Sequence, residues 1–221
     1  MVHEALAAIP QSLQVDSLSI TNGDVKYGER VVAGAGPGVL TFAAVSLSAE
    51  GIANRGDASA AIQLRAEGDL MGTGTLKVLM AIPTSAPNFS LRYSGSLGAM
   101  DLTRLSAFLD IAELTRITSG SAQAVEYEIE VIDGQARGHV RAIYRDLEIA
   151  VLDTYTGTEK GFDNRVASFL VNVLKIRNAN APNASGAMQE GKVNYTGRPE
   201  DTFMQFVWFA LRSGVLDAIG H

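Results

Sequence analysis

The sequence predicts a mainly β fold with a few helices, built around one elongated, curved antiparallel sheet. Three observations support this prediction. Apolar and polar residues alternate over several stretches, which is the pattern of strands with one covered and one solvated face. Short turn sequences join these stretches. No segment long enough for a crossover helix separates successive strands, as a parallel sheet would require. We therefore expect a meander of long hairpins, with two or three amphipathic helices covering the apolar face.

The clearest hairpin runs from Ala124 to Tyr144. Apolar residues alternate with charged ones on both sides of Asp133-Gly134. Asp-Gly favours a type I′ turn, because both central residues of that turn need a positive φ. Folding about this turn pairs three glutamates with basic residues across the strands: Glu130 with Arg137, Glu128 with His139, and Glu126 with Arg141. Each such pair contributes about 0.2–1 kcal/mol.

A second hairpin is predicted within Leu13 to Arg30, where Asn22-Gly23 offers the same kind of turn. A two-residue turn at this dipeptide would pair Ile20 with Val25 on the apolar face. These two segments would then be short neighbouring strands.

Further strands follow along the chain. Residues 40–50 alternate with a change of phase between Phe42 and Val45, which indicates a β-bulge. Three more alternating strands are predicted over residues 60–67, 76–82 and 89–94, with a turn around Gly72 and Gly74 between the first two.

Three helices are predicted, each with a residue that suits a helix start. Asp101 can cap a short one, and Asp163 can cap a second in which apolar residues recur at helical spacing. The last helix would begin at Pro199 and end at Gly220. It is apolar over most of its circumference, so either the chain's own sheet or a partner protein must cover it. Both alternatives stay open from the sequence.

Length and composition favour one folded domain over residues 1–221. Apolar residues make up 47% and charged residues 19%, as in folded chains. The net charge of −6, with scattered Lys and Arg, argues against a nucleic-acid partner, which needs a concentrated basic surface. The longest apolar stretch, Phe203 to Leu211, is far shorter than the ~20 residues of a transmembrane helix, so no transmembrane segment is expected. No secretion signal is visible at the N-terminus.

No catalytic constellation is visible in the sequence. The histidines are His3, His139 and His221, of which two are terminal and the third faces Glu128 in the predicted hairpin. A zinc site or a Ser-His-Asp triad needs several convergent groups. There is no cysteine, and the Gly-rich stretches lack the lysine of a phosphate loop. We therefore expect no enzyme, no metal and no cofactor.

The apolar strand face is the feature with functional promise. It is either a core packed by the helices or a groove whose lining is partly available to acyl chains. In the second case seven residues are candidates for lipid binding: Ile62, Leu64, Leu76, Val78, Met80, Phe89 and Leu91. An alternative is a structural module, or one that binds a protein or glycan, with no lipid role. A glycan- or protein-binding module would present an exposed aromatic cluster.

Short motifs in the second half of the chain resemble those of one family. Four blocks follow one another: Gly95-Ser96-Leu97-Gly98-Ala99-Met100-Asp101, Ile117-Thr118-Ser119-Gly120, Tyr144-Arg145-Asp146-Leu147-Glu148-Ile149 and Ser168-Phe169-Leu170-Val171-Asn172. Leu13 to Tyr27 fits the segment that precedes them. The blocks are similar to the C-terminal region of AsmA-like envelope proteins of Gram-negative bacteria, particularly a Bacteroidetes-type branch that is largely uncharacterised.

This resemblance implies a location and a role. Such proteins are anchored in the inner membrane by an N-terminal helix and project a long β groove into the periplasm. They are associated with outer-membrane biogenesis and phospholipid transport. The chain would be a non-enzymatic segment of a longer periplasmic protein, in contact with phospholipid acyl chains and with other envelope proteins through its C-terminal helix. The family pattern supplies no catalytic residues.

Overall fold

The computed structural model describes residues 1–30, 36–55, 61–84, 86, 88–155 and 167–220 of the chain. Their strands are β1 (Gln14–Glu29), β2 (Gly38–Ala53), β3 (Ala61–Leu70), β4 (Gly74–Pro83), β5 (Leu91–Leu97), β6 (Met100–Asp101), β7 (Thr115–Ile132), β8 (Gln135–Tyr155), β9 (Ala167–Val173) and β10 (Glu190–Thr196). Their helices are α1 (Val2–Ala7), the 3-10 helix η1 (Leu102–Leu105), α2 (Ser106–Ala112) and α3 (Phe203–Ile219).

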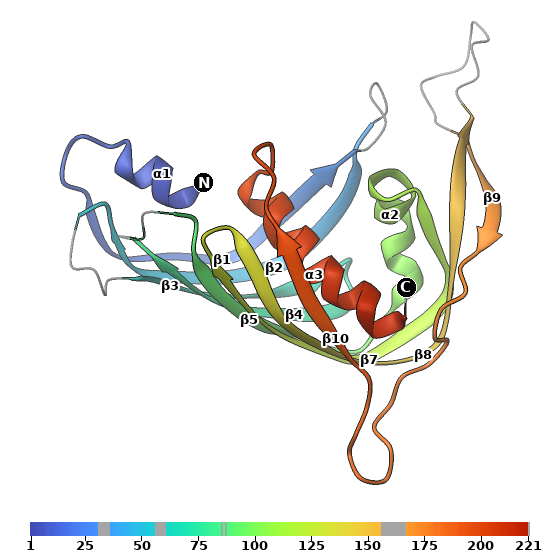
Figure 1. Cartoon of the computed structure of the whole chain (residues 1–221). Helices are drawn as coiled ribbons and strands as arrows, with labels where there is room; N and C mark the ends of the chain where they lie inside the picture. Colours follow the sequence, from blue (N-terminus) through green and yellow to red (C-terminus); the bar gives the residue numbers. More distant parts are fainter. Residues whose placement is uncertain (31–35, 56–60, 85, 87, 156–166, 221) are drawn as a thin grey trace, which may run out of the picture.

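All these strands belong to one antiparallel sheet. Its order is β1-β2-β3-β4-β5-β7-β8-β10, with β6 beside β7 and β9 beside β8. The sheet is open and strongly curved, and the three α-helices lie on its concave side (Figure 1). The predicted mainly β fold, with helices on one face and the last helix at the C-terminus, is confirmed.

The hairpin around Asp133-Gly134 forms as predicted. Asp133 has a φ of 51° and Gly134 a φ of 75°, so both occupy the left-handed region that a type I′ turn requires. The register pairs Glu130 with Arg137, Glu128 with His139 and Glu126 with Arg141. The local turn sequence and the alternation therefore determine the two longest strands, β7 and β8.

The hairpin predicted around Asn22-Gly23 is wrong. β1 is one continuous strand, and it pairs with β2 both before this dipeptide, at Ile20, and after it, at Val25. Asn22 has a positive φ of 54°, but Gly23 does not, so the condition for a type I′ turn is not met. The dipeptide forms an irregularity in the β1–β2 register instead. A long neighbouring strand offers more backbone hydrogen bonds than a reversal of the chain would.

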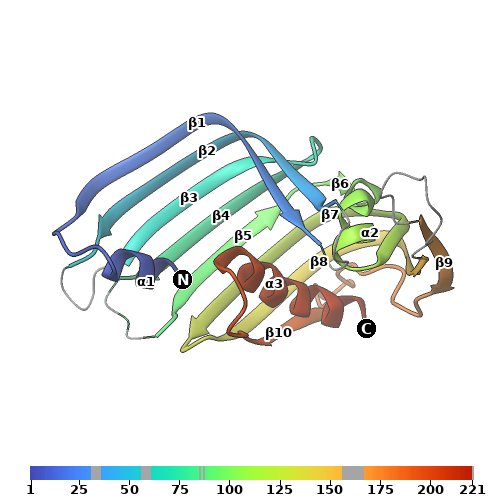
Figure 2. The ribbon, with the colours of Figure 1, turned by 90° about the horizontal axis from the view of Figure 1, so that it is seen from above.

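The bulge predicted in β2 is confirmed. The register of β2 against β3 shifts between Ala43 and Ser46, and Ala44 has a positive φ of 50°. An extra residue of this kind bends a strand and increases its twist. The bulge in β2 faces the irregularity in β1, where Gly23 pairs with Val45. Both strands bend here and curl toward α2 (Figure 2).

The first predicted helix is confirmed as η1 followed by α2. The Asp101 carboxylate accepts hydrogen bonds from the backbone nitrogen and the hydroxyl of Thr103, at 2.9 and 2.7 Å, which lowers the pKa of Asp101. Phe108 is fully buried and contacts the rings of Tyr27 and Trp208. The short helix therefore closes one end of the core.

The helix predicted after Asp163 is wrong where the structure describes it. Asp163 itself lies outside the described residues. Ala167–Val173 forms β9, which pairs with β8 in an antiparallel ladder. The same segment is rich in aromatic and β-branched residues, which favour a strand when a neighbouring edge is available. β8 provides that edge because it extends to Tyr155.

The C-terminal helix begins later than predicted, at Phe203 and not at Pro199. Thr202 and Gln205 form a capping box, a Thr-x-x-Gln pattern that the sequence analysis missed. The helix ends as predicted at Gly220, which has a φ of 82°. The short helix α1 was not predicted at all. No helix among the described residues is long and apolar enough to cross a membrane.

The chain's own sheet covers α3, which answers the question that the sequence left open. The helix lies over β7, β8 and β10 (Figure 2). A β-carbon added at Gly191 in β10 would lie 1.9 Å from the carbonyl oxygen of Gly214 in α3, so the two backbones touch. Phe206 is fully buried between this helix and the sheet. The apolar side of α3 is therefore used within the chain.

Candidate functional site

The concave face of the sheet is apolar across its width, but the helices cover only part of it. α3 covers β7, β8 and β10, α2 lies at one end of the sheet, and α1 lies toward the opposite ends of β3 and β4 (Figure 2). No helix of the described residues lies over the middle of β1–β4 (Figure 2). We call the apolar side chains there the free concave surface: Leu18, Ile20, Val25, Leu47, Leu64, Ala66 and Val78.

The side chains of this surface are least buried at the β1 edge. Val78 in β4 and Leu47 in β2 are half-buried. In β1, Leu18 is 49% exposed, and Ile20 and Val25 are each 45% exposed. Apolar side chains exposed together over neighbouring strands indicate a binding surface more strongly than scattered ones do.

The seven residues predicted from the sequence divide into two groups. In β3, β4 and β5, Ile62, Met80 and Leu91 are buried, whereas Leu64, Leu76 and Val78 are half-buried on the same concave face. Phe89 precedes β5, and its ring centre lies 4.9 Å from that of Phe206 in α3. Phe89 and Leu91 therefore belong to the core, while Leu64 and Val78 belong to the free concave surface.

The sequence analysis missed the part of this surface that β1 and β2 provide. Leu18, Ile20 and Val25 alternate with polar residues, so the signal was present. The predicted turn at Asn22-Gly23 split β1 in two and hid its continuous apolar row. Only the register with β2 shows that these residues continue the face formed by Leu47 and Leu64.

A polar contact joins β1 to α3 and limits the surface at one end. The Tyr27 hydroxyl donates to Glu29 at 2.7 Å, and the Gln205 amide donates to the same carboxylate at 3.0 and 3.2 Å. Burial raises the pKa of Tyr27 above its ordinary value, and the hydrogen bond to the Glu29 carboxylate raises it further. The end of the edge strand β1 is thereby fixed to α3, the helix that covers β7, β8 and β10 on the same concave face (Figure 2).

A second contact lies beside the first. Trp208 donates its indole N–H to Glu113 at 3.1 Å, and Arg212 forms an ion pair with the same carboxylate at 2.7 Å. Glu113 follows α2, while Trp208 and Arg212 belong to α3. These contacts hold α2, α3 and the end of β1 together. The free concave surface begins beyond them, over the middle of β1–β4.

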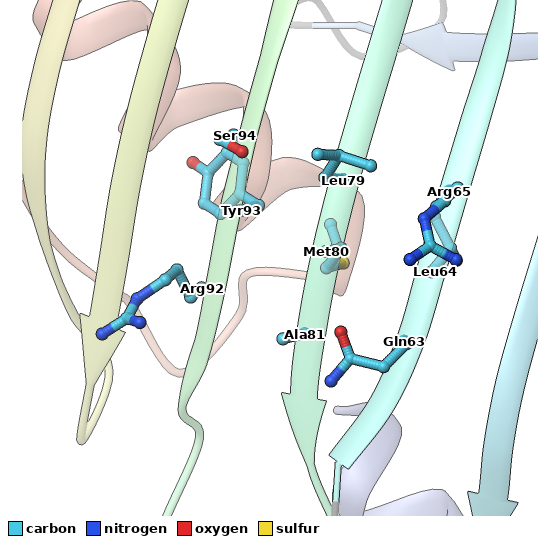
Figure 3. Close-up of a pocket in the computed structure, with 9 residues that line it drawn as sticks. All are labelled: Gln63, Leu64, Arg65, Leu79, Met80, Ala81, Arg92, Tyr93 and Ser94. Carbon is cyan, nitrogen blue, oxygen red and sulfur yellow. The ribbon is translucent and has the colours of Figure 1, made fainter.

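The charged residues of β3 and β4 lie on the convex face. A hollow of about 170 Å³ lies on it over Ala81, beside Gln63, Arg65 and Leu79 (Figure 3). The Arg92 side chain extends from this hollow toward β7, where it pairs with Glu130 at 2.5 Å. That ion pair raises the pKa of Arg92. Because the pair is exposed, it stabilises the fold only slightly.

Among the described residues, neither face brings three His, Asp or Glu side chains together in a way that could hold a metal ion. His139 is exposed on the convex face opposite Glu128. The free concave surface is therefore the feature from which a function can be argued.

Comparison of the chain with protein-family models, with curated proteins and with solved structures gives no match. The resemblance to AsmA-like proteins stays a prediction from the sequence motifs. Function has to be argued from the geometry of the molecule.

Proposed function

We propose that the chain is a non-enzymatic binding segment that holds acyl chains of phospholipids on the free concave surface. By its AsmA-like motifs it would act in the periplasm, in phospholipid handling or outer-membrane maintenance. The observation that carries the proposal is the exposed apolar row of β1, which continues without interruption into the half-buried residues of β2, β3 and β4.

The division of charge between the two faces supports this proposal. Arg65, Lys77 and Glu126 alternate with the concave residues of their strands, so their side chains lie on the convex face. The concave floor offers acyl chains an apolar contact. Burying apolar surface stabilises such a complex by about 25 cal/mol per Å².

A glycan-binding role has less support. Glycan-binding sites commonly contain exposed aromatic rings. None of the large exposed apolar residues among those described is aromatic: Leu18, Ile20, Val25, Leu79, Ile132 and Met204. Trp208 is occupied by its contacts with Phe108 and Glu113. A structural role with no ligand is the alternative that the following experiment tests.

Val78→Asp tests the proposal, with Leu79→Asp as its matched control. The two residues are neighbours in β4, but Val78 lies on the free concave surface and Leu79 is 52% exposed on the convex face. We expect Val78→Asp to weaken phospholipid binding at least tenfold, because an acyl chain would have to cover a carboxylate. Leu79→Asp should leave binding unchanged. Native mass spectrometry with added phosphatidylethanolamine measures both affinities.

Urea unfolding of both variants shows whether each one remains folded. A wild-type chain that binds no phospholipid would contradict the proposal and favour the structural role. Equal weakening by both aspartates would show that the lipid does not lie on the concave face.

A further inference from the structure

One tyrosine hydroxyl on the concave face, that of Tyr127, has no hydrogen-bond partner among the described residues. The structure describes five tyrosine side chains, and four of them donate from the hydroxyl: Tyr27 to Glu29, Tyr93 to the Val207 carbonyl, Tyr144 to the Arg177 carbonyl, and Tyr195 to Asp201. Tyr127 is only 7% exposed, and its hydroxyl bonds to no described residue. The hydroxyl oxygen is not fully enclosed, so it keeps a contact with solvent that a ligand oxygen could replace.

The Tyr127 ring lies directly above a glycine. Tyr127 in β7 pairs with Gly95 in β5, and a β-carbon at Gly95 would lie 2.3 Å from the Tyr127 hydroxyl oxygen. The ring therefore reaches from β7 to β5, with its hydroxyl above Gly95. Val78 is the residue of β4 that pairs with Gly95.

This hydroxyl stands at the inner end of a row that crosses the free concave surface. In register, the row runs through Ile20, Leu47, Ala66, Val78, Gly95 and Tyr127. Ala66 has the smallest side chain of the row outside Gly95, which the Tyr127 ring covers, so the open floor is lowest at Ala66 beside Val78. An apolar chain lying across the strands from Ile20 would reach the Tyr127 hydroxyl.

The surroundings of Tyr127 favour an uncharged group. Burial alone raises its pKa to about 12, and no charged residue contributes to the shift. Tyr27 differs, because Glu29 and Glu113 both act on it. An anionic ligand group beside Tyr127 would lose its hydration without gaining a counter-charge.

We propose that the row from Ile20 to Tyr127 binds a long-chain molecule through an uncharged oxygen, such as that of an alcohol or an ester, which accepts a hydrogen bond from Tyr127. This inference rests on the proposed function, because it uses the same surface, and adds to it a ligand whose uncharged oxygen lies at the inner end. The chain of the ligand crosses Val78, Ala66 and Leu47. The ester of a phospholipid would bring its phosphate beside Tyr127, so the ligand carries no charged group next to this oxygen.

The test compares dodecanol, dodecanoate and dodecane as probes of the full chain. We expect the wild type to bind dodecanol more tightly than either of the others. Tyr127→Phe keeps the ring over Gly95 and removes the hydroxyl. It should lower the affinity for dodecanol about three- to tenfold, which corresponds to one net hydrogen bond. The affinity for dodecane should stay unchanged. Competition against a fluorescent acyl probe gives all three affinities.

Tyr93→Phe is the matched control, because it removes a hydroxyl that is already bonded to Val207. It should leave the preference for dodecanol intact. The inference is overturned if Tyr127→Phe changes all three affinities alike, or if dodecanoate is the tightest ligand. If the wild type binds none of the probes, the proposed function fails together with it. Binding of all probes with no effect of Tyr127→Phe refutes only the inference.

Discussion

Replacing Phe206 with alanine is expected to lower the free energy of unfolding by about 3–5 kcal/mol, since it removes a large ring from a packed core. Phe206 is fully buried, and its ring centre lies 4.9 Å from that of Phe89 and 5.4 Å from that of Tyr195. For a chain of this length, the loss corresponds to a fall in Tm of roughly 6–20 °C. Urea unfolding and thermal unfolding measure the effect.

Met204→Ala is the control on the same helix. Met204 is 47% exposed, so its truncation should change the free energy of unfolding by about 0.5 kcal/mol or less. If Phe206→Ala were as mild as Met204→Ala, α3 would not pack on its own sheet. The helix would then be free for a partner, and the extent of the free concave surface would have to be drawn again.

The second large effect is expected from adding a single methyl group, in Gly191→Ala. The new β-carbon would lie 1.9 Å from the Gly214 carbonyl oxygen and 2.6 Å from the Ala218 nitrogen, both in the backbone of α3. Backbone atoms cannot turn away as a flexible side chain can, so the helix has to move off β10. We expect a loss of about 3 kcal/mol or more, at the upper end of what overpacking costs.

Gly98→Ala is the matched control for this change. Its added β-carbon would meet only Thr75 backbone atoms, at 3.6 and 3.8 Å, which is ordinary contact. Its free energy of unfolding should stay close to that of the wild type. A stability of Gly191→Ala equal to that of Gly98→Ala would mean that α3 does not approach β10 as closely as described.

The parts of the fold that local sequence determines were predictable. The turn at Asp133-Gly134 and the alternation beside it are both local, and they led to the correct register of β7 with β8. The same reasoning failed at Asn22-Gly23, because a dipeptide that suits a turn also suits a bulge. A neighbouring strand, and not the dipeptide, decides between the two. Here that strand is β2, whose own bulge at Ala44 accommodates the irregularity.

The candidate site was predictable only in part. Alternation shows which residues of β3 and β4 share a face, so Leu64 and Val78 could be named from the sequence. Alternation does not show that α3 packs on Phe89 and so covers the part of this face next to β5. Tyr127 could not be predicted as a site residue, because it follows the same alternation as its neighbours. Its position over the sheet depends on Gly95, which is 32 residues away in sequence and adjacent in the sheet.

Photolabelling with a phospholipid that carries a diazirine on one acyl chain tests most directly whether acyl chains lie on the free concave surface. Peptide mass spectrometry then identifies the labelled residues. We expect labels on the free concave surface, at Leu47, Leu64, Ala66 or Val78, and none at their convex neighbours Arg65 and Leu79. Labels on the convex residues, or labelling no stronger than that of the urea-unfolded chain, would contradict this placement of the acyl chains.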